Sequence, residues 1–73
     1  MDKTTIFVRL LDGGIEGWRP VEAVEEQPGC YRIVEVNPDP TVERWEFASG
    51  DLVRCEQQIF RGTPSLVAIA AVK

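Results

Sequence analysis

The side chains best suited to chemistry in this chain are aromatic rings interleaved with arginines. Trp18 is followed directly by Arg19, and the same two kinds of residue recur at Tyr31 and Arg44. Tryptophan, tyrosine and arginine dominate the energetic hot spots of protein interfaces. We therefore take Trp18, Arg19, Tyr31 and Arg44 as candidate binding residues for a protein partner.

An aromatic cage is a second use of these rings. Trp18, Tyr31 and Trp45, flanked by glutamates, would present negative ring faces to a cationic group. The cage requires all three rings to line one groove. Trp18 lies beside Gly17 at the start of a predicted strand, where an indole is either half exposed as a contact residue or packed in the core. The sequence leaves both alternatives open.

Catalytic chemistry lacks its usual groups. The chain has no histidine, so the proton carrier that works near neutral pH and the triads built on it are missing. Nothing in the spacing of the carboxylates marks two of them as converging. Cys55 has a basic neighbour in Arg54, but adjacent strand residues point to opposite faces. Gly13 and Gly14 lack the residues of a phosphate-binding loop. We expect no enzymatic activity and no cofactor.

The charge balance bears on partners. Eight basic against 12 acidic residues give a net charge of −4, and the basic residues are spread singly among acids. Nucleic-acid binding draws its affinity from clustered lysine and arginine, so a nucleic-acid partner is disfavoured, and an anionic membrane surface for the same reason. A nucleic-acid-binding barrel remains as an analogy of fold only.

Two cysteines and the absence of a long apolar run indicate the compartment. No stretch approaches the ~20 apolar residues of a membrane-spanning helix, and the first residues begin a strand rather than a signal peptide. Cys30 and Cys55 lack the paired spacing of a zinc site, so no metal is expected. We predict a cytoplasmic protein whose cysteines are small core residues rather than a disulfide.

Short runs of alternating apolar and polar residues separated by turn residues predict the elements. The chain of 73 residues is one domain, 1–73, of five or six strands. The runs cover residues 4–11, 18–25, 30–36, 42–48, 52–60 and 65–72. We expect an all-β fold, a small antiparallel SH3-like barrel, because closing the sheet hides strand edges that would otherwise aggregate.

Two of these runs carry particular expectations. Residues 42–48 and 52–60 flank Ser49-Gly50-Asp51 and predict a central hairpin, with Trp45 and Phe47 in the core. Residues 65–72 are apolar on both faces, which favours a central or closing strand, with a helix as the rival because the run is rich in alanine.

A longer pattern resembles a known class of protein. Residues 18–23 (WRPVEA), 29–33 (GCYRI), 45–47 (WEF), 50–55 (GDLVRC) and 66–68 (LVA) occur in an order similar to that of a class of short, uncharacterised bacterial proteins. The resemblance implies a free-standing bacterial β domain and brings no activity with it. We predict a small non-enzymatic protein-interaction module whose partner is unknown and which is as readily a homodimer as a monomer.

Overall fold

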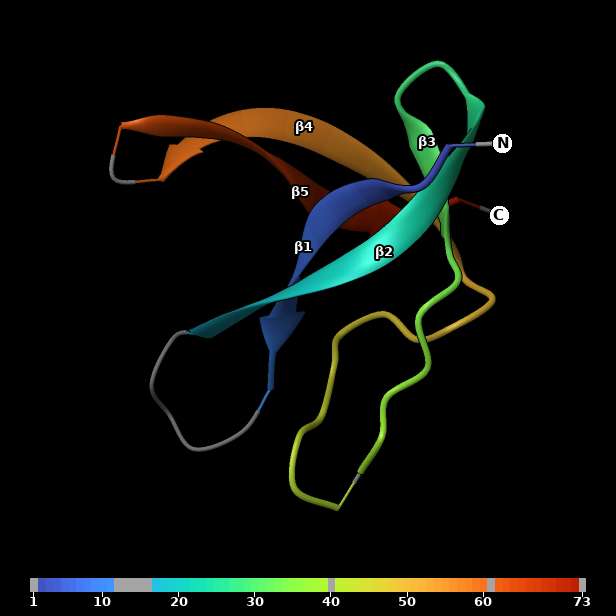
Figure 1. The fold of residues 1–73 in the computed structure, drawn as a ribbon, viewed down its shortest axis with the longest axis vertical. Coiled ribbons are helices and arrows are strands. Elements are labelled where there is room, and N and C mark those ends of the chain that lie inside the picture. Colours follow the sequence, from blue (N-terminus) through green and yellow to red (C-terminus); the bar gives the residue numbers. More distant parts are fainter. Residues whose placement is uncertain (1, 12–16, 40, 61, 73) are drawn as a thin grey trace.

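The chain folds into five β-strands. A computed structural model describes residues 2–11, 17–39, 41–60 and 62–72, and none of these residues is helical. The strands are β1 (Thr4–Leu10), β2 (Gly17–Gln27), β3 (Cys30–Ile33), β4 (Leu52–Phe60) and β5 (Thr63–Ala71), as Figure 1 shows. The all-β prediction is confirmed. The alanine-rich final run is a strand rather than a helix.

The five strands form one closed ring. Each strand pairs antiparallel with the next along the chain, and β5 returns to β1. The closing pair is parallel, with Phe7 opposite Val67. Five is an odd number, so in an up-and-down order the first and last strands must run the same way. The expected antiparallel pairing therefore fails only at the closure.

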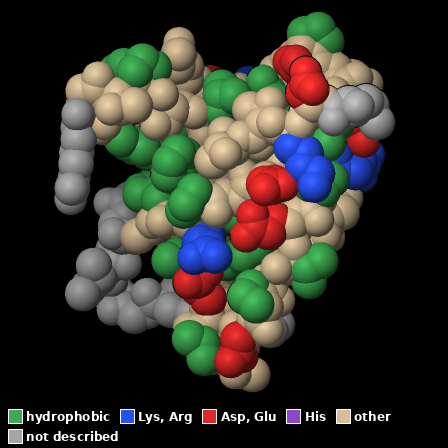
Figure 2. All heavy atoms as spheres, in the orientation of Figure 1, with side chains coloured by type: hydrophobic (Ala, Val, Ile, Leu, Met, Phe, Trp, Pro, Cys, Tyr) green, Lys and Arg blue, Asp and Glu red, His purple; other side chains and the backbone are tan. Residues whose placement is uncertain are grey.

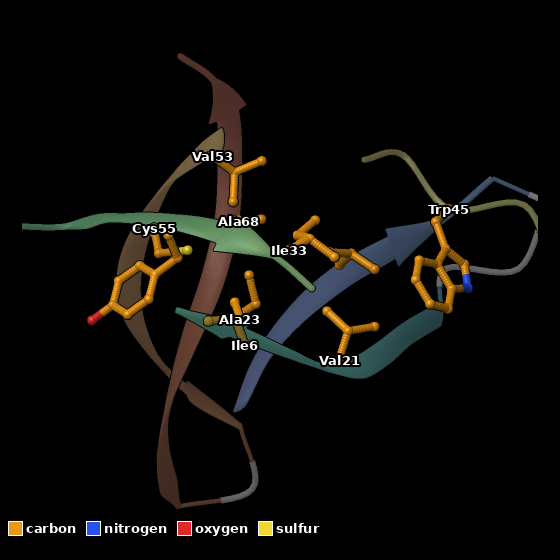
Figure 3. Packing of buried hydrophobic residues seen from close by; sticks show 10 residues of the cluster. Ile6, Val21, Ala23, Ile33, Trp45, Val53, Cys55 and Ala68 are labelled. Carbon is orange, nitrogen blue, oxygen red and sulfur yellow. The ribbon is translucent and has the colours of Figure 1, made fainter. Parts of the chain in front are cut away.

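Aliphatic side chains fill the inside of the ring. In β1, Ile6 and Val8 are fully buried, whereas the residues between and beside them point outward, as strand alternation requires. Strands β2, β3 and β4 contribute alternate residues in the same way, whereas in β5 the adjacent Val67 and Ala68 are both buried and only Ala68 belongs to the core cluster. The buried hydrophobic residues are Ile6, Val8, Val21, Ala23, Tyr31, Ile33, Trp45, Val53, Cys55, Val67 and Ala68. Figure 3 shows Trp45 at one end of this cluster and Cys55 toward the other.

Two glycine turns set the hairpins. Gly29, between β2 and β3, and Gly62, between β4 and β5, both have φ of 80°, a conformation that residues with a Cβ rarely adopt. Both turns were predicted from the residues around these glycines, the first of them as a hairpin turn. The turn expected at residues 12–14 lies outside the described residues, as do Pro40 and Arg61.

The predicted central hairpin is wrong. Residues 42–48 form no strand, and β4 pairs instead with β3 and β5. The segment pairs with the sheet through one isolated bridge between Trp45 and Leu10. Two backbone hydrogen bonds form it: the amide of Leu11 donates to the carbonyl of Arg44 at 2.8 Å, and the amide of Glu46 donates to the carbonyl of Arg9 at 2.9 Å. Trp45 nevertheless lies in the core, as alternation predicted. The loop that carries Trp45 places its ring over one end of the core cluster.

The third strand is shorter than expected. It ends at Ile33, and Val34 and Val36 are 40% and 70% exposed. The chain then runs as one long loop to β4. At the end of this loop, Gly50 (φ 90°) turns the chain into β4, and its amide donates to the carbonyl of Ile33 at 2.8 Å. The Ser49-Gly50-Asp51 turn exists, but it joins this loop to a strand rather than two strands.

Candidate functional site

Three aromatic rings pack together outside the ring of strands. Trp18 of β2 lies 5.7 Å from Phe60 of β4, and Phe7 of β1 meets the same Phe60 edge-on at 5.6 Å between ring centroids. All three side chains are half-buried. We call Phe7, Trp18 and Phe60 the aromatic face. Its residues come from three strands and leave ring surface in contact with solvent.

The sequence places these rings outward by alternation. Phe7 lies between the buried Ile6 and Val8, and Trp18 pairs with the exposed Arg9, so both point away from the core. Phe60 reaches them because the end of the β4–β5 hairpin extends past the ring (Figure 1). Hydrophobic side chains gather between this hairpin and the β1–β2 pair in Figure 2.

Arg19 lies on the other side of β2, at the end of the ring. Its Nε is 3.6 Å from Glu43 Oε1 and its Nη2 is 3.8 Å from Glu35 Oε2. Trp45 Nε1 donates to the same Glu43 Oε1 at 2.8 Å. Arg19 Nε is buried and makes no hydrogen bond. We call Arg19, Glu35, Glu43 and Trp45 the polar end. Its arginine is held between two carboxylates.

Two small hollows adjoin the polar end. One of 280 Å³ is lined by Asn37, Glu43, Arg44, Trp45 and Ala48. The other, of 120 Å³, is lined by Arg19, Asn37, Pro38, Asp39, Val42 and Glu43. Asn37 Nδ2 donates to the carbonyl of Glu43 at 2.6 Å and so braces the loop between the hollows. The lining mixes charges of both signs, which suits a polar side chain of a partner better than a free cation.

Tyr31 lies away from both sites. It is 9% exposed, and its pKa is raised by burial and by the nearby Glu25 and Cys55. Tyr31 lies near Cys55, which is why the Cys55 charge raises its pKa, and Figure 3 shows Cys55 and Trp45 toward opposite ends of the core. Tyr31 and Trp45 therefore do not face one groove. Trp18 is on the outer face of β2. The three rings of the proposed cage are therefore not brought together.

The four candidate binding residues thus divide among three places. Trp18 belongs to the aromatic face, Arg19 belongs to the polar end with Arg44 in the hollow beside it, and Tyr31 is in the core. Sequence reasoning missed Phe60 as a binding residue. Alternation places it outward, but only the length of the hairpin beyond the ring brings it to Trp18.

Cys55 offers little reactivity. Both are free thiols, and burial raises the pKa of Cys55 from 9.0 to about 11, which leaves it protonated near neutral pH. Within the described ranges, no group of three metal-ligating side chains comes together. The part of the chain that the structure describes also contains no helix long and apolar enough to cross a bilayer.

Comparison of the chain with models of protein families, with curated proteins and with solved structures finds no match. The aromatic face and the polar end are therefore interpreted from their own chemistry.

Proposed function

We propose that this protein is a small, non-enzymatic protein-interaction module that binds its partner through the aromatic face. One observation carries the proposal: Phe7, Trp18 and Phe60 pack on one another outside the core and stay half exposed. Half-buried aromatic rings supply large contact area at low cost in side-chain entropy.

The fold we infer is a small barrel of the SH3-like kind. Strong bending of the strands supports this inference, because β2 pairs with β1 over its first part and with β3 over its last part (Figure 1). The closed strand order supports it as well. Free Cys30 and Cys55 fit a reducing compartment, so we place the protein in the bacterial cytoplasm.

The arginines argue for a protein partner over a nucleic acid. Arg19 faces Glu35 and Glu43, and Arg32 forms a two-pronged pair with Glu26, at 2.6 and 3.0 Å. Positive charge already matched by carboxylates is not free to neutralise phosphates, and the chain carries a net charge of −4.

A capture experiment tests the proposal. Purified wild-type protein and a Trp18→Ala variant would be used to retain partners from a bacterial lysate, and the affinity of the retained protein would then be measured with both. We expect the variant to bind at least about tenfold more weakly, the loss typical of an aromatic hot spot.

A matched control keeps the result specific. Val36 is 70% exposed on the loop after β3, so Val36→Ala removes an exposed apolar side chain elsewhere and should leave the affinity unchanged. Equal binding by the wild type and the Trp18→Ala variant would remove the aromatic face from the interface. Retention of nucleic acid by the wild type would favour the nucleic-acid alternative.

A further inference from the structure

The last part of β4 has a free backbone edge. On the side away from β5, β4 pairs with β3 from Leu52 to Arg54, and the amide of Cys55 donates to the carbonyl of Gly29 at 2.9 Å. Beyond Cys55, no other described strand pairs with this side of β4. Glu56 to Ile59 are all exposed. From Glu56 to Phe60, β4 is therefore an edge strand that no described strand pairs with on the side away from β5.

The direction of the amides on this edge is fixed by two observations. The amide of Cys55 points away from β5, and amides two residues apart in a strand point the same way, so those of Gln57 and Ile59 also face outward. Ile59 pairs with Pro64, which has no amide hydrogen to donate across the hairpin. Both observations place the Gln57 and Ile59 amides and carbonyls on the open edge.

Two other open stretches of strand edge carry a proline at an outward position. Pro64 removes the outward amide at the start of β5. In β2, the amide of Glu22 donates outward to Glu35 Oε1 at 3.0 Å, so Pro20, two residues earlier, occupies the same outward position. Proline at an edge prevents pairing with another strand. The β4 edge from Glu56 to Phe60 contains no proline, so its backbone is able to pair with another strand.

We propose that an extended segment of the partner protein adds to the sheet as a strand along Gln57 to Phe60. This inference rests on the proposed function and specifies how the aromatic face is used. Backbone hydrogen bonds to Gln57 and Ile59 supply the attachment, and alternate side chains of the segment lie beside Phe60, the ring of the aromatic face that β4 carries.

Side chains along β4 define the kind of segment. Glu56 and Phe60 are four residues apart in one strand and therefore share a face, with Gln58 between them. Beyond Glu56, the carboxylate of Glu25 lies at the β2–β3 turn, where it accepts the amide of Gly29 at 3.2 Å. The matching segment carries an apolar side chain opposite Phe60 and, four residues away, a basic side chain opposite Glu56.

A second copy of this chain fits the edge poorly. An antiparallel pairing of two β4 strands about Gln58 would set the copy's Phe60 opposite Glu56, directly beside Cys55. The amide of Cys55 is already bonded to Gly29. The rest of the copy would therefore meet the β2–β3 turn, whereas a single extended peptide can end opposite Glu56.

Hydrogen exchange with a defined probe tests the inference. The probe is a blocked threonine peptide carrying one phenylalanine and, four positions later, one lysine. Its titration into the wild-type protein is followed by NMR. We expect binding at about 1 mM or tighter and about tenfold slower exchange of the Gln57 and Ile59 amides. The amide of Gln58, which faces β5, is the internal control and should not change.

Two variants separate the backbone from the side chain of Ile59. Ile59→Ala keeps the outward amide and should bind the probe within about threefold of the wild type. Ile59→Pro removes the outward amide and should weaken binding at least about tenfold. Should Ile59→Pro fail to fold, the wild type is tested with two N-methylated probes instead. One probe is methylated on the amides that face β4 and should not bind, and the other is methylated on the alternate amides and should bind like the unmodified probe.

Several results would overturn strand addition. A probe that shifts the Trp18 indole resonance without protecting Gln57 and Ile59 would show binding to the aromatic face alone, which leaves the proposed function standing. Protection that appears without probe and rises with protein concentration would assign the edge to a second copy. Absence of binding at several millimolar probe, or equal binding when its lysine is replaced by glutamate, would refute the segment described above.

Discussion

The inside of the strand ring and the aromatic face differ in the size of their side chains. Inside, Val8, Val53 and Ala23 are fully buried, whereas outside Phe7 and Trp18 are only half-buried. Five strands enclose a narrow space that β-branched and small side chains fill. Large rings are left at the end of the ring or on its outer surface. Aromatic character alone therefore does not mark a core residue in so small a domain.

The comparison separates two roles. Inner residues hold the fold, because burial of apolar surface is the main stabilising contribution. Outer rings add less stability and leave surface that a partner can cover. The two tryptophans represent the two roles: Trp45 is 8% exposed in the core cluster and Trp18 lies on the aromatic face.

The largest expected effect is at Trp45. Replacing it by alanine empties the end of the core, and we expect the free energy of unfolding to fall by about 3–5 kcal/mol, measured by urea denaturation. Trp45→Phe is the control, because it keeps a ring in place while losing the hydrogen bond to Glu43. Cooperative melting of Trp45→Ala near the wild-type temperature would contradict the core role of this residue.

The next largest effect concerns Cys55 and pH. The pKa of this buried thiol is about 11 in the folded protein against 9.0 ordinarily. Between these two values the unfolded chain loses the thiol proton first, so the unfolded state gains stability. The free energy of unfolding should therefore be unaffected below pH 9 and fall by about 2–3 kcal/mol by pH 11.

The matched variant for this pH effect is Cys55→Ala. Its stability at neutral pH will differ, but the part of the decline due to the thiol should vanish. Tyr31, whose pKa is raised above 10.0 chiefly by burial, contributes its own decline in both proteins, a smaller one in Cys55→Ala because the Cys55 thiolate no longer raises that pKa. Denaturation curves of equal pH dependence in the two proteins would show that Cys55 is not buried as described.

A smaller effect is expected at Trp18. Trp18→Ala removes one ring contact and part of a half-buried surface, so we expect a loss of about 1–2 kcal/mol, well below that at Trp45. Thermal and urea unfolding of both variants in one buffer gives the comparison. A loss at Trp18 equal to that at Trp45 would make the aromatic face a second core.

The smallest effect is expected at an exposed ion pair. Hydrogen bonding by Arg32 lowers the pKa of Glu26 below 4.5. The pair therefore stabilises the fold at neutral pH, and this contribution is lost as the pH falls below about 4.5. Glu26→Gln should lower stability at neutral pH by less than Trp18→Ala does, and the difference should shrink at high salt. A difference that stays constant from neutral pH to pH 3 would argue against the pair.

Much of the fold could be predicted from sequence. The bounds of β4 agree with the predicted run at residues 52–60, and Gly29 and Gly62 stand in the turns where the sequence expected them. The error at residues 42–48 has a physical cause. Alternation correctly identified Trp45 as buried. A buried ring flanked by polar residues gives the same sequence pattern in a loop as in a strand, so alternation could not tell the two apart.

The candidate site was predicted less completely. Trp18 and Arg19 are adjacent in sequence, yet they lie on opposite faces of β2 and belong to different surfaces. Nothing local to Phe60 indicates that its ring meets Trp18, because the contact depends on how far the β4–β5 hairpin extends.

The sequence by itself determined the all-β class, the hairpin turns and which faces of β1 and β4 are apolar, because period-two alternation and turn residues act over a few residues. Only the tertiary structure decided that the sheet closes through Phe7 and Val67, that Trp45 covers the end of the ring and that β4 keeps an open edge. These features depend on contacts between residues far apart in the chain, and no local pattern encodes which distant segments will meet.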